Sequence, residues 1–345
     1  MKNTENAISS RISWIDVCRG IAILFVLYAH VLGSDSYRHL FYAFHMPLFF
    51  FLSGIVFKED YKSFFGLVIK SCKTILVPYF IFACLTYLLW FLKEPSTHNT
   101  LNDFIYQIQG IFYGNGNNGY LYFNVALWFL PCLFITKIGF ALITKFFSST
   151  KIIIGIIMLF SIAGYVLSSY YSSSKLPFGI ETALSAIVFF GVGFLVKRNT
   201  HLFPLMMKNG LLLFITGLVL IVIFGTINYN MYGYQIDMRM NRLNNYFLFY
   251  AGALSGIVCW VAFSMMIGKN LILEYIGKHT LHLFVWHYLL FSTFNDFASM
   301  FVPIDILNMI RFLLPTVYTT TAVGLILGVI HLWRKVIYKY FSSKE

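Results

Sequence analysis

The sequence predicts an all-α membrane protein, a polytopic helical bundle with about ten transmembrane helices and both termini in the cytoplasm. Three observations predict this fold class. Hydrophobic residues make up 59% of the 345 residues and charged residues only 11%, whereas about a quarter of the residues of a soluble domain are charged. Apolar runs of membrane-spanning length recur along the chain. The Lys and Arg residues are distributed unevenly between the loops.

Ten apolar segments are long enough to cross a bilayer, with boundaries defined to within a few residues. They cover residues 18–33, 39–57, 74–92, 122–138, 152–170, 176–196, 210–227, 246–267, 279–297 and 307–333. If the N-terminus is cytoplasmic, 19 of the 25 Lys and Arg residues fall on the inner side. Because cytoplasmic loops are enriched in basic residues, this bias predicts that both termini are inside. The net charge of +12 therefore reflects topology, and no nucleic-acid partner is expected.

We expect a single domain over residues 1–345, with a cytoplasmic leader at 1–17 and a basic cytoplasmic tail at 334–345. No cleavable signal peptide is expected, because a long polar leader precedes the first apolar run and that run contains His30. The five cysteines are scattered without a CxxC pair. They predict neither a disulfide framework nor a zinc site.

The first apolar segment carries three ionisable residues, Asp16, Arg19 and His30. In a helix, Arg19 and His30 would share one face about 16 Å apart along the axis. Asp16 precedes Arg19 by three residues, which predicts an i, i+3 contact. Arg19 alone could be a headgroup anchor and His30 alone an interfacial histidine. The three together favour a functional site, because ionisable groups at membrane depth cost free energy.

His45 lies near the outer end of the second segment, close to where the first segment ends. The short loop between the two segments predicts antiparallel neighbours, so His30 and His45 are expected to line one outward-facing cavity. The alternative is that His45 caps an interfacial turn before Pro47, since proline is tolerated near a helix start.

Two stretches of sequence are specific enough to suggest a family. WIDVCRGIA, whose Arg19 precedes His30 by eleven residues, and FHMPLFFFLSG at 44–54 resemble the acyltransferase-3 family of integral membrane acyltransferases. The likeness is strongest to the branch of fucose 4-O-acetylases and membrane O-acetyltransferases of bacterial surface polysaccharides. Mostly apolar likenesses extend it over most of the chain: LVPYFIF, ALWFLPCLF, FFGVGFLVKR and YIGKHTLHLFVWH.

The resemblance implies that Arg19 and His30 are required for transfer. It also implies that a basic pair after the second span helps to hold the acyl donor, and here Lys70 and Lys73 replace the family's two arginines. Lysine keeps the charge but lacks the planar fork that grips phosphate, and a simple topology anchor is the alternative. His287 matches a histidine that recurs late in the family, for which we expect a structural or cavity-lining role.

The expected chemistry moves acetyl from acetyl-CoA to a sugar hydroxyl. An alcohol is a poor nucleophile at neutral pH, so a base is needed, and His30 is the candidate. Arg19 is assigned to electrostatic stabilisation of the donor or the oxyanion, with Asp16 orienting it. Lys70 and Lys73, together with Arg19, are the candidate donor-binding residues.

The acceptor is expected on the outer side, where we assign His45, Glu181 and Trp128. Trp128 could instead serve only packing, and Glu181 could lie at the lipid boundary. Two outer loops, 114–123 and 228–246, combine asparagines, aromatics and charged residues. That mix suits sugars, but it also suits an ordinary turn or a solvated interfacial loop.

His279 and His282 are one helical turn apart, which invites a metal interpretation. No carboxylate or cysteine accompanies them, so no metal is expected. The sequence thus predicts a membrane O-acetyltransferase of the bacterial inner membrane whose partners are acetyl-CoA, a surface glycan or lipid-linked sugar, and the bilayer.

The alternative is a transporter or flippase of a lipid-linked glycan, although no inverted repeat with broken helices is evident. The sequence leaves open the identity of the acceptor sugar, its hydroxyl and the acyl group. It also leaves open whether transfer is direct or passes through an acyl-enzyme. The oligomeric state is open as well, and a homo-oligomer is one alternative.

Overall fold

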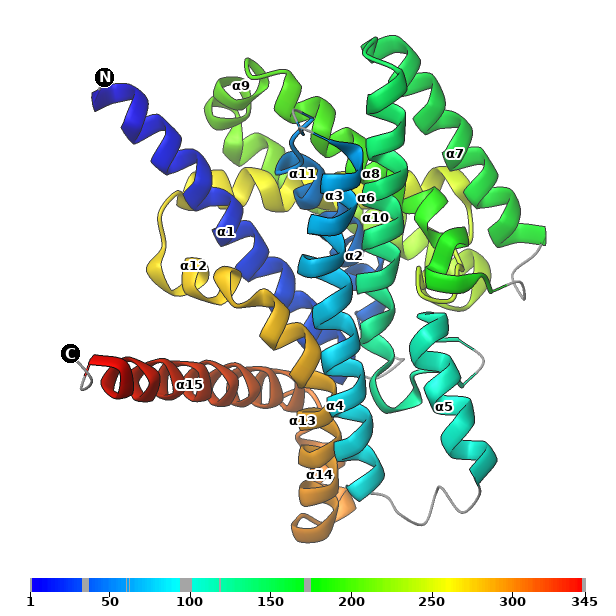
Figure 1. Ribbon diagram of the computed structural model, residues 1–345, viewed down its shortest axis with the longest axis vertical. Helices are drawn as coiled ribbons and strands as arrows, with labels where there is room; N and C mark the ends of the chain where they lie inside the picture. The colour runs from blue at the N-terminus through cyan, green and yellow to red at the C-terminus, as the bar shows by residue number, and fades with distance from the viewer. Residues whose placement is uncertain are drawn as a thin grey trace. The chain divides into compact units, whose positions relative to one another are not determined.

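The computed structural model describes residues 2–32, 37–59, 61, 63–93, 101–117, 119–170 and 175–342. These residues are mostly helical and form no β-strand, apart from one isolated bridge between Asp237 and Arg242. The all-α prediction is therefore confirmed. The chain divides into two compact units (Figure 1), Met1–Ser36 with Ile267–Glu345 (unit 1) and Tyr37–Met266 (unit 2).

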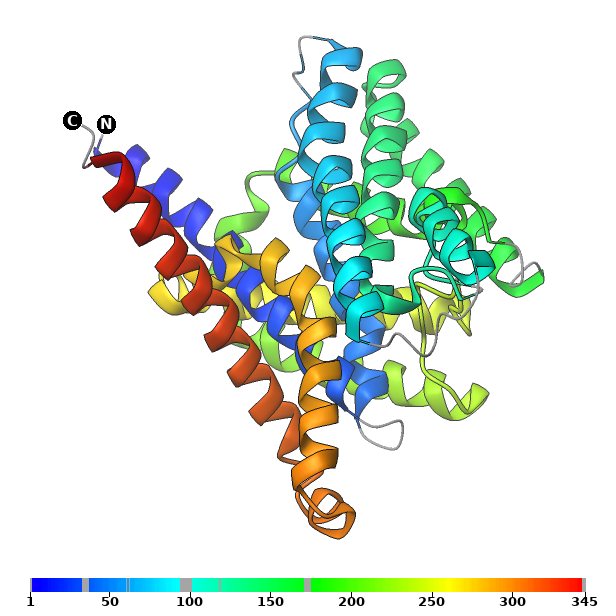
Figure 2. The same ribbon diagram turned by 60° about the horizontal axis from the view of Figure 1, so that its bottom comes forward.

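Unit 1 is built from the two ends of the chain. Its helices are α1 (Lys2–Val31), α12 (Leu271–Lys278), α13 (Thr280–Phe301), α14 (Ile304–Met309) and α15 (Leu314–Ser342). α1 packs against α12, α13 and α15. Figure 2 shows α15 running beside α1 in the opposite direction.

Unit 2 contains the central part of the chain. Its helices are α2 (Arg38–Ile55), α3 (Phe64–Ser71), the π-helix η1 (Cys72–Leu76), α4 (Val77–Lys93), α5 (Leu101–Tyr113), the 3₁₀-helix η3 (Tyr122–Trp128), α6 (Phe129–Phe146), α7 (Thr150–Tyr170), the 3₁₀-helix η4 (Pro177–Gly179), α8 (Ile180–Arg198), α9 (Leu202–Lys208), α10 (Gly210–Tyr232) and α11 (Tyr246–Ile267). α8 contacts α2, α6 and α7, so it forms the centre of this unit.

Eight helical segments of the described chain are long and apolar enough to cross a membrane. They are Ser13–Val31, Phe64–Lys93, Tyr122–Phe146, Thr150–Tyr170, Pro177–Arg198, Gly210–Tyr232, Tyr246–Ile267 and Leu314–Val336. The two remaining predicted spans, 39–57 and 279–297, coincide with α2 and α13 but are not among these eight. Each of them carries two or more histidines, which lower the hydropathy of the segment.

Several predicted boundaries are wrong. The first membrane-spanning segment begins at Ser13 instead of 18 and is continuous with helix α1, which begins at Lys2. The last span begins at Leu314 instead of 307, because the chain turns between α14 and α15. Pro315 then occupies the first turn of α15, where its missing N–H costs nothing. α3, η1 and α4 are continuous from Phe64, so the predicted basic pair lies within a helix and not ahead of one.

α2 and α8 pack backbone against backbone in unit 2. A Cβ added to Gly54 would lie 1.9 Å from the carbonyl oxygen of Phe190, and one added to Gly193 would lie 2.1 Å from that of Phe51. Neither distance is possible for real atoms, so both positions require glycine. Small residues allow this close approach between membrane helices, and it holds α2 against the centre of the unit.

Candidate active site

The ionisable residues of α1 are held in place by α12. A Cβ on Gly277 would lie 1.9 Å from the carbonyl oxygen of Asp16, and one on Gly20 would lie 2.3 Å from that of Leu273. The two backbones therefore touch beside Arg19, and the position of this turn of α1 is fixed by contact with α12.

Asp16 and Arg19 form the predicted i, i+3 ion pair. Arg19 Nη1 lies 3.3 Å from Asp16 Oδ1. The Asp16 side chain is 12% exposed and that of Arg19 32%, so the carboxylate is largely buried while the guanidinium remains accessible to a ligand. The pair leaves Arg19 with further N–H donors to offer, since a guanidinium carries five.

His30 lies beside a second histidine, His287 of α13. Their ring centroids are 4.9 Å apart with an interplanar angle of 49°. His30 is half-buried, whereas His287 is completely buried. The phenyl ring of Phe291 contacts His287 at 5.5 Å, so the deeper imidazole has an apolar side.

Both imidazoles contact backbone carbonyls of their own helices through Nδ1. His30 Nδ1 lies 2.8 Å from the oxygen of Val26, and His287 Nδ1 lies 2.8 Å from that of Phe284. A carbonyl can only accept, so each neutral ring carries its proton on Nδ1 and has a lone pair on Nε2. Within the described part of the chain, the buried Nε2 of His287 has no hydrogen-bond partner.

His45 lies in the interior of α2 in unit 2. It is buried, and its Nδ1 contacts the oxygen of Phe41 at 2.5 Å. The alternative that His45 caps an interfacial turn is wrong, because the helix begins at Arg38 and continues through Pro47. His30 and His45 belong to different units, so the cavity they were expected to share stays a prediction.

Unit 2 also contains a basic pocket of about 610 Å³. Three lysines line it: Lys58, Lys70 and Lys137. Phe57 and Phe190, which stack edge-to-face at 5.5 Å, form part of its wall. The pocket therefore combines three cations with a rigid aromatic side.

Only one lysine of the predicted donor-binding pair lines this pocket. Lys70 is at the end of α3, and Lys73 lies in the π-helix that follows. Lys73 is exposed and is not among the lining residues. A π-helix has more residues per turn than an α-helix, so the usual i, i+3 alignment of the two side chains is lost.

Glu181 and the outer loops form a polar network in unit 2. The buried carboxylate of Glu181 accepts hydrogen bonds from Asn115 Nδ2 at 2.9 Å and from the backbone N–H of Leu176 at 3.1 Å. Both oxygens are thus engaged in joining the loop after α5 to the start of α8. Within the described residues, the Glu181 carboxylate accepts hydrogen bonds from an amide and a backbone N–H and from no histidine.

The loop around Arg239 completes this network. Arg239 donates from Nη1 to the carbonyl of Gly116 at 2.5 Å and pairs through Nη2 with Asp237 at 3.5 Å. Asn117 donates to the Arg239 carbonyl at 2.7 Å. Trp128 is 7% exposed and lies beside Gly116. The two outer loops singled out in the sequence are therefore in direct contact.

Tyr42 and Lys175 lie next to this polar network. Tyr42, which contacts the ring of His45 at 5.0 Å, is within electrostatic range of Asp237 and Arg239. Lys175 donates to the carbonyl of Met240 at 2.7 Å, and its burial lowers the pKa of the ammonium. His45 is thus linked through Tyr42 to the same charged loop.

His279 and His282 are neighbours in unit 1, with ring centroids 6.3 Å apart. His279 is buried, and its Nδ1 contacts the carbonyl of Tyr275 at 2.7 Å. Among the described residues, no group of three or more His, Cys, Asp or Glu side chains is placed to hold a metal ion.

The comparison with protein families decides the class of the protein. A family model described as an acyltransferase domain, that of the acyltransferase-3 family, matches residues 12–333. The chain belongs to the acyltransferase-3 family. No curated protein and no solved structure matches it.

This membrane acyltransferase therefore has two groups of residues that suit acyl transfer. Unit 1 contains His30, the candidate base, with its buried neighbour His287 and the Asp16–Arg19 pair. Unit 2 supplies cations that can hold an anionic donor. An acyltransferase needs both, because proton removal activates the acceptor and charge binds the carrier of the acyl group.

Sequence reasoning missed two residues of these groups and the contact made by a third, His287. Lys58 and Lys137 were counted only as inner-side basic residues, and His287 was given no role in the reaction. The positive-inside assignment did place both lysines on the same side as Lys70. No sequence signal paired His287 with His30, because they are 257 positions apart.

Proposed function

We propose that this membrane acyltransferase transfers acetyl from acetyl-CoA to a sugar hydroxyl of a cell-surface polysaccharide or its lipid-linked precursor. The observation that carries the proposal is the contact between His30 and His287. A half-buried imidazole that is oriented by the Val26 carbonyl and by a second ring is suited to deprotonate a hydroxyl.

The reaction proceeds in one displacement. His30 Nε2 accepts the proton of the sugar hydroxyl, whose oxygen attacks the thioester carbonyl carbon. The tetrahedral intermediate collapses, the C–S bond breaks, and the departing CoA thiolate takes the proton from His30. Arg19, oriented by Asp16, stabilises the oxyanion or the donor by its charge. An acyl-histidine at His30 is the alternative route.

The lysine pocket supports acetyl-CoA as the donor. CoA carries several phosphate charges, and Lys58, Lys70 and Lys137 offer three ammonium groups around one cavity. Lysine binds phosphate as a point charge, so the loss of the family's arginine fork at Lys70 and Lys73 is offset by the two additional lysines. Lys73 does not line the pocket and contributes only general positive charge to this part of the helix.

The outer network supports a sugar acceptor. Hydroxyl groups both donate and accept, and amide, guanidinium and carboxylate groups are gathered where the two outer loops meet. We assign His45, Glu181 and Trp128 to this acceptor side, with Glu181 acting through the loop that it holds. The protein would act in the bacterial inner membrane, with its termini and acetyl-CoA on the cytoplasmic side.

Mass spectrometry of surface polysaccharide tests the proposal. Cells expressing the wild-type chain or His30→Ala are compared, with membrane levels of both checked by blot and His201→Ala, an exposed histidine, as the matched control. We expect the mass of one acetyl group per modified sugar with the wild type and the control, and its loss with His30→Ala.

The same cells test the alternative function. If deletion of the gene leaves the polysaccharide mass unchanged but stops the glycan from reaching the surface, the protein moves a lipid-linked glycan and does not modify it. Membership of an acyltransferase family favours the enzyme.

A further inference from the structure

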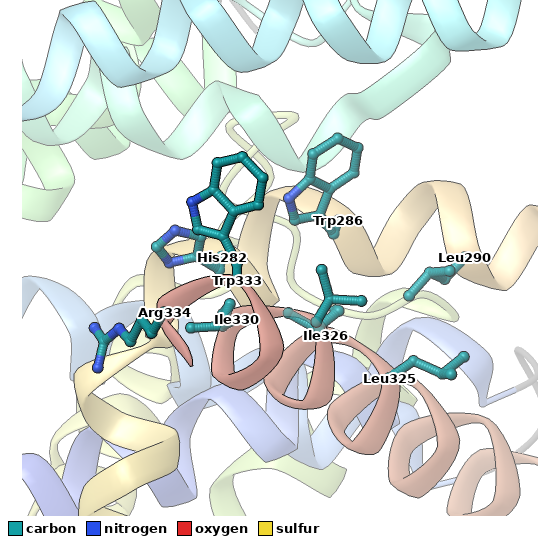
Figure 3. A pocket seen from close by; sticks show the side chains of 9 residues that line it. His282, Trp286, Leu290, Leu325, Ile326, Ile330, Trp333 and Arg334 are labelled. Atoms are coloured by element: carbon teal, nitrogen blue, oxygen red, sulfur yellow. The ribbon is translucent and has the colours of Figure 1, made fainter. Parts of the chain in front are cut away.

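α13 and α15 enclose a groove of about 400 Å³ in unit 1 (Figure 3). It is separate from the His30 contact, because it is formed by a different set of α13 residues. The lining residues are His282, Trp286, Leu290, Leu325, Ile326, Val329, Ile330, Trp333 and Arg334.

The groove follows from helical periodicity. His282, Trp286 and Leu290 are spaced four residues apart along one face of α13, so they cover about 12 Å of the helix. On α15 the lining residues recur at the same interval. Val329 and Trp333 are each 65% exposed, so the groove is open on its outer side instead of being a closed core cavity.

The two ends of the groove differ in chemistry. Figure 3 shows Arg334 and His282 at one end and Leu290 and Leu325 at the other. Arg334 is exposed, and within the described residues it has no ion-pair partner. His282 lies within electrostatic range of Arg334 and of His279. One end is therefore basic, and the rest of the lining is apolar.

This distribution selects an amphipathic ligand with one anionic group. A guanidinium is well suited to phosphate oxygens, and apolar side chains favour a hydrocarbon chain by burying its surface. Tryptophan is enriched at the level of the lipid headgroups, and Trp333 directly precedes Arg334. A soluble nucleotide donor would leave most of its polar groups against an apolar wall.

We propose that this groove binds one acyl chain of an anionic phospholipid, with the lipid phosphate against Arg334. The predicted topology places Arg334 and the neighbouring Lys335 at the cytoplasmic surface, where anionic headgroups attract basic residues. The bound lipid fills the space between α13 and α15 and so supports the helix that carries His287. The site does not depend on the identity of the acyl donor or acceptor.

Native mass spectrometry of the full chain, purified in detergent, tests this site. Dioleoyl phosphatidylglycerol and dioleoyl phosphatidylcholine are added at equal concentration. We expect one retained phosphatidylglycerol, at least about tenfold more abundant than retained phosphatidylcholine. Val329→Trp fills the groove and abolishes retention of both lipids, whereas Leu332→Trp, an equally exposed neighbour outside the groove, retains the lipid like the wild type.

The headgroup assignment has its own pair of variants. Arg334→Gln should lower retention of phosphatidylglycerol to the level of phosphatidylcholine, while Lys335→Gln leaves the preference intact. Size-exclusion profiles and thermal unfolding confirm that each variant is folded, and Leu325→Trp provides a second groove-filling variant. Equal retention of the two lipids by the wild type, or undiminished retention by both folded groove-filling variants, would overturn the proposal.

Discussion

The histidine pair of unit 1 and the lysine pocket of unit 2 place functional groups in opposite settings. His287 is completely buried next to His30, and each Nδ1 contacts the backbone of its own helix. Lys58 and Lys70 line the pocket of unit 2, and both side chains are exposed. The histidines are oriented by contacts with their own helices, whereas two of the three pocket lysines are exposed and Lys137 is half-buried.

The difference fits the role that we propose for each group. A base must present one lone pair in one direction, so its ring is fixed by hydrogen bonds and packing. A cation that holds a phosphate needs charge and reach more than direction. Substitutions in unit 1 should therefore act on kcat, and those in the lysine pocket on KM for the donor.

His30→Ala tests the strongest form of this comparison. Removing the base should lower kcat about 10³-fold while KM for acetyl-CoA changes little. Acetyl transfer in membranes is measured at varied donor concentration, with His201→Ala as the control. Retention of more than a tenth of wild-type kcat would show that His30 is not the base.

His287→Ala should have the next largest effect. Loss of the buried imidazole removes the ring that packs against His30, and we expect kcat to fall by about 10- to 100-fold with little change in either KM. His287→Gln, which keeps a polar group of similar length, should recover part of the loss. Unfolding temperatures separate this effect from general destabilisation, and an unchanged kcat would mean that the ring contact is not used in the reaction.

Lys70→Ala should raise KM for acetyl-CoA about tenfold, because a hydrogen bond between the donor and an exposed charged group is lost. Lys70→Arg should stay near the wild type. Lys73→Ala should have a smaller effect, since Lys73 does not line the pocket. Lys151→Ala on α7, which also lies outside the lining, is the control. Equal increases in KM for Lys70→Ala and Lys73→Ala would show that lining the pocket does not determine which lysine binds the donor.

Glu181→Gln sharpens the comparison on the acceptor side. The amide places a donor against either Asn115 or the Leu176 N–H, so one hydrogen bond of the outer loops is lost. We expect KM for the polysaccharide acceptor to rise about fivefold, with KM for acetyl-CoA unchanged. A change in donor KM instead would move Glu181 to the donor side.

Ser13→Ala should give the smallest effect, on stability alone. The Ser13 hydroxyl donates to Glu274 and lowers the pKa of that carboxyl against the effect of burial, with Lys278 assisting. Between the lowered pKa and the ordinary carboxyl value, the folded state binds fewer protons than the unfolded state. The stabilisation is therefore complete above the ordinary value and is lost as pH falls through the lowered one.

The measurement for Ser13→Ala is thermal unfolding in detergent across this range. The variant should lose about 1 kcal/mol of unfolding free energy at pH 7, and the difference from the wild type should shrink as pH falls below the pKa of Glu274. A difference that stays constant with pH would show that Ser13 acts through packing and not through the carboxylate.

Much of the fold could be predicted from the sequence, because membrane helices are specified locally. Hydropathy located helices at all ten predicted spans, and three-residue spacing predicted the Asp16–Arg19 contact. The errors lie at boundaries. The turn before Leu314 is part of an apolar stretch and has no hydropathy signal. The two histidine-containing helices, α2 and α13, have lower hydropathy than the other spans, and their polar side chains need partners on neighbouring helices.

The candidate site divides in the same way. The sequence by itself determined that this is a polytopic membrane protein with Asp16, Arg19 and His30 on its first helix, since composition and helical periodicity are properties of contiguous residues. Tertiary structure alone decided that His287 contacts His30, that Lys58 and Lys137 join Lys70, and that Glu181 binds Asn115. These contacts depend on how helices distant in sequence pack. Lys73 lies outside the pocket lining because it is in a π-helix, whose wider turn changes the direction of the side chain, and a periodic sequence pattern does not reveal a π-helix.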